Sequence, residues 1–403
     1  MTALAVAAMF EYGGPLRIVV TGASGFIGST LVPMLASLGH PIVALDRTPP
    51  ATSHANVLNV TGELTQPCDD FLDALHEADA VIHLAGCPGV RDNGPDVAWR
   101  RQRDNVDAAR MVLDATPART PVMALSSSSV YGGARSGPST QPPAHRPIAL
   151  PGGPSTRSTL DDSAPVRVRA SREDDPLIPR GGYASSKVAA ERICRQRAQT
   201  GRPVLIVRPF TVLGERQRSD MALARWAGQA RASGAVTVIG SPTRTRDFTD
   251  VREVSRTLIA LLRSGVTGTV NLGSGRAHSL ADLVAAVGAA VDVPSPQVDL
   301  VPAASDEVRH TLADTERLRS LIGDVPRTDL YDLVRRAVAN PAPANPAPTS
   351  SPSASASASA SASASASASQ DADRRATERS TTPAEAPQHN SSSGQAANWG
   401  ERQ

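Results

Sequence analysis

A tyrosine and a lysine four residues apart form the most reactive pair that the sequence offers. Tyr183 and Lys187 stand one helical turn apart, so both side chains would project from the same face of a helix. A tyrosine with the usual pKa of ~10 is a poor base at neutral pH, and a nearby ammonium group favours its phenolate. Lys187 is the only lysine among the 403 residues, and a planar guanidinium replaces a compact ammonium poorly. The pair therefore predicts proton transfer to and from a substrate hydroxyl.

A run of four serines, residues 126–129, offers hydroxyl groups for the same chemistry. It directly follows a short apolar run, 122–125, which we interpret as a strand. Open parallel sheets bind their ligands at the carboxyl ends of strands, so these hydroxyls would lie in a binding crevice. A polar loop that merely caps a strand is the alternative interpretation of the serine run taken alone.

Three glycines at intervals of three, Gly22, Gly25 and Gly28, stand between an apolar run and a helical pattern. Glycines let the backbone approach a pyrophosphate closely, and a helix N-terminus adds N–H groups and a positive dipole. Asp46 ends the next apolar run, where a carboxylate accepts hydrogen bonds from an adenosine ribose and repels a 2′-phosphate. The arrangement predicts a dinucleotide, NAD rather than NADP, although Arg47 beside it could partly tolerate that phosphate.

Apolar runs of strand length alternate with segments of helix length. We expect core strands at 16–20, 42–45, 80–83, 122–125 and 204–207. Such alternation is typical of a parallel sheet with helices on both faces. Residues 210–338 mix short strands such as 236–239 with helices such as 280–290. We therefore expect an α/β fold, a Rossmann-type doubly wound parallel sheet with a small C-terminal α/β substrate-binding lid.

Composition sets the bounds of the folded part. Residues 339–403 consist mainly of Pro, Ala, Ser and Thr, and so few large apolar side chains cannot offset the entropy of ordering. We expect a disordered tail there, a disordered lead-in over 1–15 without a basic n-region, and a surface insertion over 134–170. The domain between them would span 16–338, with an NAD-binding core at about 16–208 and 247–271 and a lid at about 209–246 and 272–338.

Charge and cysteine usage exclude several classes of function. The formal net charge of +2, with acidic and basic residues mixed, argues against a nucleic-acid surface. Cys68, Cys87 and Cys194 are an odd number without metal-ligand spacing, which indicates reduced cytosolic thiols and no metal site. No stretch approaches the length that spans a bilayer. We expect a cytoplasmic protein without a membrane partner.

Together the motifs resemble the extended short-chain dehydrogenase/reductases, specifically the NAD-dependent epimerase/dehydratase group that modifies nucleoside-diphosphate sugars. The resemblance runs from about 16 to 338 and is broken by the insertion. It rests on TGASGFIG (21–28), HLAG (83–86), SSSSVYG (126–132), YASSK (183–187), RPFTV (208–212), RDFTDV (246–251) and NLGSG (271–275). It implies a Rossmann-type core, NAD as the cofactor, a nucleotide-sugar substrate and a homodimer.

The resemblance also assigns site residues by position. Ser127, Tyr183 and Lys187 would be catalytic, with Ser127 on the reacting oxygen and Lys187 on the nicotinamide ribose. The implied cofactor-binding residues are Gly22, Ser24, Gly25, Phe26, Ile27, Gly28, Asp46, Arg47, Glu63, Leu64, Leu84, Ala85, Gly86, Asn105, Tyr183, Lys187 and Pro209. The implied substrate-binding residues are Arg91, Ser127, Ser128, Thr211, Arg218, Arg246 and Arg309.

Within the family the likeness is greatest to UDP-glucuronate 4-epimerases. It rests on GVR (89–91), FTVLG (210–214) and QRSDMA (217–222), and it implies that Thr211 and Arg218 lie near a sugar carboxylate. Leu213 replaces the usual tyrosine, and alanines at 303–304 replace the usual lead of the next motif. A solvated surface position is an equal alternative for Arg91 and Arg218. Arg246, a candidate for the pyrophosphate, could equally form a structural ion pair.

The expected reaction is 4-epimerisation of a UDP-hexose or UDP-hexuronate through a transient 4-keto sugar. Ser128 and Ser129 stand where family dehydratases carry Asp-Glu, and decarboxylating members usually keep a glutamate at the position of Ser129, so both of those reactions are disfavoured. A reductase or dehydrogenase of a keto sugar or another alcohol is the first alternative. A non-catalytic dinucleotide-binding protein is the second, and the intact set of Ser127, Tyr183 and Lys187 argues against it.

Overall fold

The computed structural model describes residues 14–49, 53–89, 94–136, 168–304 and 307–342. All of these belong to one compact unit, residues 1–345. The predicted tail from residue 343 onward, the predicted lead-in up to residue 13 and most of the predicted insertion lie outside the described residues. Arg91 lies outside them as well.

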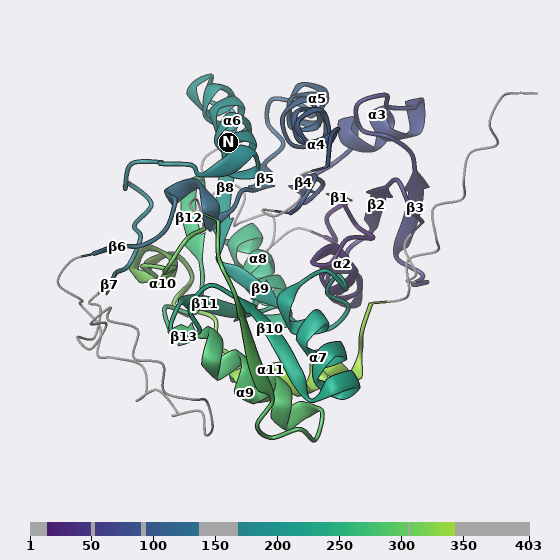
Figure 1. Ribbon diagram of the computed structural model, residues 1–403. Helices are drawn as coiled ribbons and strands as arrows, with labels where there is room; N and C mark the ends of the chain where they lie inside the picture. The colour runs from purple at the N-terminus through teal and green to yellow at the C-terminus, as the bar shows by residue number, and fades with distance from the viewer. Residues whose placement is uncertain (1–13, 50–52, 90–93, 137–167, 305–306, 343–403) are drawn as a thin grey trace, which may run out of the picture. The chain divides into compact units, whose positions relative to one another are not determined.

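The core is a sheet of seven parallel strands in the order β12-β8-β5-β4-β1-β2-β3 (Figure 1). Its strands are β1 (Ile18–Thr21), β2 (Ile42–Asp46), β3 (Val57–Thr61), β4 (Ala80–His83), β5 (Val122–Leu125), β8 (Val204–Pro209) and β12 (Gly268–Leu272). The chain runs outward from β1 in both directions, so β1 and β4 flank the point where the strand order reverses. In sheets of this kind that point forms the ligand crevice, at the carboxyl ends of the strands.

The five predicted core strands are confirmed, two of them with the observed bounds, 80–83 and 122–125. Two strands of this seven-stranded sheet, β3 and β12, were not predicted. Most side chains of β3 are exposed or only half-buried, because it is the edge strand. A strand of this kind lacks the apolar run that marks the buried strands of a parallel sheet.

Helices cover both faces of the sheet, as the prediction of a doubly wound fold requires (Figure 1). One face packs against α2 (Gly28–Ser37), α8 (Val251–Ser264) and α10 (Glu316–Ile322). The other packs against α3 (Asp69–His76), α5 (Ala108–Ala115) and α6 (Gly181–Gln199). The helix α4 (Val97–Arg101) runs through a six-residue π-helical segment, η1 (Gln102–Asp107), into α5. Each helix turns an apolar stripe toward the strands, and burial of that stripe supplies most of its stability.

A separate hydrophobic cluster forms in the C-terminal part, which we propose as the substrate-binding lid. It joins α7 (Ala222–Ser233), α9 (Leu280–Ala290), α11 (Leu330–Ala339) and the paired strands β10 (Ala235–Ile239) and β14 (Gln297–Val301). The predicted helix 280–290 has the observed bounds. A three-stranded sheet, β9 (Thr211–Leu213), β11 (Thr245–Asp250) and β13 (Ala277–Ser279), lies between this cluster and the core.

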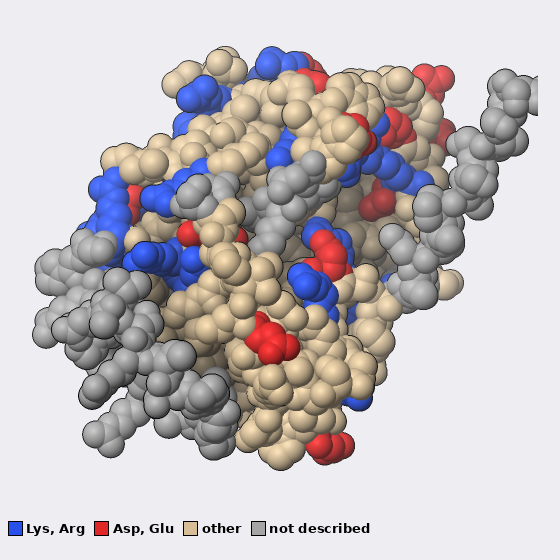
Figure 2. Space-filling model, viewed as in Figure 1, with Lys and Arg blue, Asp and Glu red and all other residues tan. Residues whose placement is uncertain are grey.

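Two short strands lie just inside the two ends of the predicted insertion, 134–170. β6 (Arg135–Ser136) pairs antiparallel with β7 (Val168–Arg169), so the described ends of the segment are held side by side. No helix among the described residues has the length and apolar character needed to cross a bilayer. On the face drawn in Figure 2, basic and acidic side chains are interspersed and in several places lie against one another, in keeping with the balanced composition.

Candidate active site

Ser127 and Tyr183 meet at the carboxyl end of the sheet. Ser127 follows β5 in extended backbone (φ −163°) and caps the short 3-10 helix η2 (Ser128–Tyr131), where its Oγ accepts the N–H of Ser129 at 3.2 Å. Tyr183 is the third residue of α6. The Ser127 hydroxyl lies close enough to Tyr183 to influence its pKa. Burial raises the pKa of Tyr183, while the hydrogen bond from Ser127 and the charges of Arg218 and Arg101 favour the phenolate.

Lys187 lies beneath this pair with only 7% of its surface exposed. Its Nζ donates to the carbonyl oxygen of Leu125 at 3.1 Å, directly before the serine run. Burial lowers the pKa of Lys187 to about 8, so the folded protein holds the ammonium form less firmly than the unfolded chain. The positive charges that lower the pKa of Tyr183, after the larger effects of burial and Ser127, are those of Arg218 and Arg101; the sequence suggests Lys187 for this role.

The glycine loop has the backbone geometry that a dinucleotide requires. Gly22 has φ +72°, and a Cβ there would stand 2.6 Å from the backbone nitrogen of Ala85. A Cβ on Gly28, the first residue of α2, would stand 2.3 Å from the carbonyl oxygen of Gly22. No side chain caps the N-terminus of α2. The residues present therefore fit a pyrophosphate held between the loop and the helix N-terminus.

Asp46 and Arg47 bear on the choice between NAD and NADP. The carboxylate of Asp46 accepts the N–H of Ser24 at 3.0 Å and that of Thr48 at 3.1 Å. The guanidinium of Arg47 is held by two carboxylates, Asp104 at 3.1 Å and Glu63 at 2.7 Å. Because these neutralise Arg47 and Asp46 stays close to the loop, the arrangement favours NAD. Glu63, expected near the adenine, makes this ion pair.

Asn105, on η1, connects the catalytic helix to the segment after β4. Its Oδ1 accepts the N–H of Cys87 at 2.8 Å, and its Nδ2 donates to the Oγ of Ser186 at 2.9 Å. The other expected cofactor residues lie at the carboxyl ends of β1, β3, β4 and β8; they are Gly25, Phe26, Ile27, Leu64, Leu84, Ala85, Gly86 and Pro209. In the described part of the chain no cluster of His, Cys, Asp or Glu could hold a metal ion.

Arg101 is a site residue that the sequence analysis missed. It ends α4, is 7% exposed, and its Nη2 donates to the carbonyl oxygen of Gly89 at 2.8 Å. Its Nη1 would stand 2.9 Å from a Cβ at Gly182, the residue directly before Tyr183. The spacing of Arg101 and Asn105 could have revealed it, since residues four apart share a helix face.

The expected substrate residues divide into two groups. Arg218 acts electrostatically on Tyr183, which places it at the active site, and its guanidinium pairs with Asp220 at 2.7 Å. Thr211 opens β9 and Ser128 opens η2, and both side chains are half-buried.

Arg246 and Arg309 form the second group. The guanidinium of Arg246 donates to the carbonyl oxygens of Thr245, Val308 and Arg309 at 2.8 to 3.0 Å. It also pairs with Glu307 at 3.4 Å. These contacts support the structural alternative for Arg246, which ties β11 to residues 307–309. The side chain of Arg309 is exposed.

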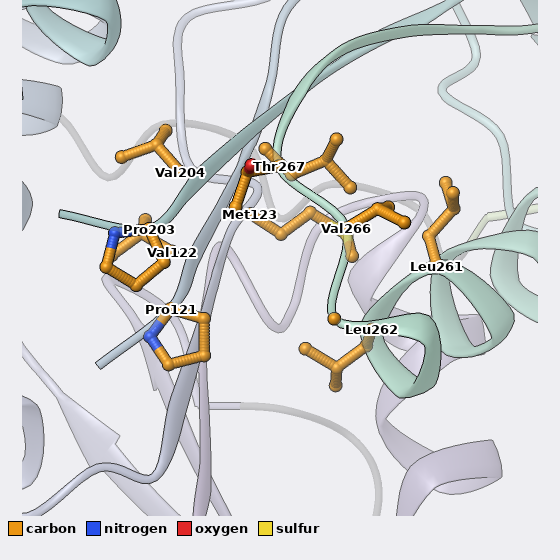
Figure 3. A pocket seen from close by; sticks show the side chains of 11 residues that line it. Pro121, Val122, Met123, Pro203, Val204, Leu261, Leu262, Val266 and Thr267 are labelled. Carbon is orange, nitrogen blue, oxygen red and sulfur yellow. The ribbon is translucent and has the colours of Figure 1, made fainter. Parts of the chain in front are cut away.

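Two hollows lie near the core, and only one borders the catalytic residues. An apolar hollow of about 270 Å³ is lined by residues 121–123, 203–205 and the end of α8 (Figure 3). These are the amino ends of β5 and β8, so this hollow lies at the opposite edge of the sheet from Ser127. The second, of about 290 Å³, is lined by Lys187, Glu191 and His83 among others.

Comparison with known proteins gives consistent relatives. A model described as the NAD dependent epimerase/dehydratase family matches residues 18–273. A Bacillus subtilis (strain 168) protein named as the uncharacterized UDP-glucose epimerase YtcB is 28% identical over 344 residues, which cover 80% of this chain and 97% of that protein.

Solved structures give the same result. The UDP-glucuronic acid 4-epimerase from Bacillus cereus, in complex with UDP-glucuronic acid and NAD, has a TM-score of 0.67 and 26% identity, covering 80% of this chain and 98% of its own. MoeE5 in complex with UDP-glucuronic acid and NAD has a TM-score of 0.64 and 30% identity, with the same coverage of 80% and 98%. Proteins named as a decarboxylase and a dehydratase also match, so similarity alone leaves the reaction open.

Proposed function

The chain belongs to the NAD-dependent epimerase/dehydratase family, whose members act on sugar nucleotides, and we propose that it catalyses 4-epimerisation of a UDP-hexose or UDP-hexuronate. UDP-glucuronate and UDP-galacturonate are the substrates that we favour. The observation that carries the proposal is the placement of Ser127 at the carboxyl end of β5 close to Tyr183 on α6, with Lys187 buried on the same helix face and the charge of Arg218 acting on the tyrosine.

Each catalytic group has a defined task in this reaction. Bound NAD supplies the reversible hydride acceptor. Tyr183, as the phenolate, removes the proton from the O4 hydroxyl of the sugar, while the Ser127 hydroxyl donates a hydrogen bond to the same oxygen. Lys187 would hold the nicotinamide ribose. After the 4-keto sugar has turned in the site, the same hydride would return to the other face of C4 while Tyr183 returns the proton to O4, so no external reductant is consumed.

The residues around this pair favour epimerisation over the other reactions of the family. Ser128 and Ser129 follow Ser127. Their two hydroxyls cannot together supply the general acid and the general base that elimination of water requires. Arg218 offers a planar fork of donors that matches a carboxylate, which supports a hexuronate. Thr211, half-buried at the start of β9, is our second candidate for that carboxylate.

The test uses purified protein without added reductant. UDP-glucuronate and UDP-glucose are incubated with it separately, and the anomeric proton signals are followed by NMR. We expect the galacto isomer from UDP-glucuronate, and Tyr183→Phe should lower the rate by about 10²–10⁴-fold. Stoichiometric NADH formation would instead identify a dehydrogenase. No change with either substrate, in protein that holds NAD, would refute the assignment.

Two further parts of the proposal concern the state of the protein. We propose a homodimer, which light scattering of the purified chain tests directly. We also propose a cytoplasmic location on the evidence of the cysteine pattern, and Cys68, Cys87 and Cys194 form no disulfide among the described residues.

A further inference from the structure

A buried ion pair stands next to the catalytic residues without taking part in the proposed chemistry. Glu191 lies on α6, four residues after Lys187 and therefore on the same helix face. Its carboxylate accepts hydrogen bonds from Nε of Arg208 at 2.9 Å and from Nη2 at 2.8 Å. Both side chains are 1% exposed. Desolvating two charges so completely contributes little net stability, so a buried pair of this kind invites a specific explanation.

The Glu191–Arg208 pair forms hydrogen bonds to both ends of the loop 126–131, which carries Ser127. At one end, the Oγ of Ser126 donates to Oε1 of Glu191 at 2.5 Å. At the other end, Nη1 of Arg208 donates to the hydroxyl of Tyr131 at 2.7 Å. The guanidinium also lies over the tyrosine ring, 4.9 Å from its centroid. One ion pair therefore contacts the residues directly before and four residues after Ser127.

The contacts continue into the segment that follows the predicted insertion. The hydroxyl of Tyr131 donates to Oδ1 of Asn271 at 2.7 Å. The backbone N–H of Asn271 donates to Glu173 at 2.8 Å, and the carbonyl oxygen of Glu173 accepts from Arg208 at 3.0 Å. These bonds join β8, β12, η2 and α6 in one network.

We propose that Glu191 and Arg208 are positioning residues that clamp the loop of Ser127 and Ser128 against the helix of Tyr183 and Lys187, and so keep the Ser127 hydroxyl beside Tyr183. Backbone bonds also hold the loop, such as the N–H of Ser126 to Val207 at 2.7 Å. They attach it to β8 and to Ile178. Its hydrogen bonds to α6 come from side chains, those of the clamp and that of Lys187 Nζ to the carbonyl oxygen of Leu125 at 3.1 Å. The inference rests on the proposed function for its kinetic test.

Mild variants test the clamp without leaving a buried charge unpaired. Ser126→Ala removes the hydrogen bond to Glu191, and Tyr131→Phe removes the hydrogen bond from Arg208. Both variants leave Glu191 and Arg208 paired with each other. Matched controls are Ser255→Ala, a buried serine that bonds only within α8, and Tyr331→Phe, an exposed tyrosine of α11. All rates are measured well below the melting temperature of each variant.

We expect each single variant to lower kcat about tenfold with little change in KM, the rate equivalent of one internal hydrogen bond of ~1.4 kcal/mol. The kcat of the double variant should fall by more than the product of the two single effects, because one of the two hydrogen bonds still holds the loop in each single variant. A double variant whose kcat stays within about twofold of the controls, or whose only change is a higher KM, would overturn the proposal.

A spectroscopic measurement tests the clamp even if the substrate has been misassigned. The charged and titratable groups that act on Tyr183 are Arg218, Arg101 and Cys87, and none is altered in these variants. Loss of the bond from Ser127 should therefore move the tyrosinate absorbance transition of Tyr183 to higher pH, seen as the difference from a matched Tyr183→Phe background. A transition unchanged in the double variant would show that the ion pair serves structure alone.

Discussion

Gly22→Ala should disable the cofactor loop through crowding as well as backbone strain. An alanine at φ +72° costs about 1–2 kcal/mol relative to glycine. The new Cβ would also stand 2.6 to 2.9 Å from three backbone atoms of residues 84 and 85. Backbone atoms cannot yield as a flexible side chain does, so β1 and the segment after β4 must separate. We expect a total loss of about 3 kcal/mol or more in the free energy of unfolding.

Gly39→Ala is the matched control, because it adds the backbone strain of a positive φ without crowding the new Cβ. Gly39 has φ +88°, and a Cβ there would meet nothing within 4 Å. This variant should lose only about 1–2 kcal/mol and bind NAD as the parent does.

The assay is urea unfolding for stability and calorimetric titration with NAD for affinity. Gly22→Ala should bind NAD at least about tenfold more weakly than Gly39→Ala, a difference of ~1.4 kcal/mol. Equal stability and equal affinity of the two variants would refute the reasoning, since it would mean that the close approach of residues 22 and 85 has no energetic weight.

Three further predictions concern the charges at the site. Burial lowers the pKa of Lys187 from 10.5 to about 8, so the unfolded chain binds more protons than the folded protein between these two pH values. The free energy of unfolding of the apoprotein should therefore rise over this pH range, by about 3 kcal/mol relative to Lys187→Met. Stability curves of the two proteins that run parallel over this range would contradict the prediction. Arg101→Gln should raise the pKa of Tyr183 and move the acid limb of the kcat profile to higher pH, whereas Arg100→Gln, one residue earlier on α4, should leave that limb in place. Arg218→Met should raise KM for UDP-glucuronate by about tenfold or more with little effect on UDP-glucose, and equal effects on both substrates would exclude a contact with the carboxylate.

Local pattern sufficed to predict the framework of this protein. Buried parallel strands are continuous apolar runs, and amphipathic helices repeat their apolar residues at helical spacing, so both could be located from neighbours in the chain. The glycine loop and the Tyr183–Lys187 pair are also local, because their function depends on a spacing of three or four residues. The edge strand β3 escaped because few of its side chains are buried.

Contacts between distant residues were decided by the tertiary structure alone. Arg101 reaches Gly182, Glu191 pairs with Arg208 and contacts Ser126, and Arg246 binds carbonyl oxygens more than sixty residues away. With 40 arginines to one lysine in the chain, residue type gave no means of separating the buried arginines from the solvated ones. An arginine acquires its role from the carboxylate, carbonyl or helix end that packing brings to it. Spacing along the chain determines which face a side chain occupies, whereas its partner depends on how the elements close upon one another.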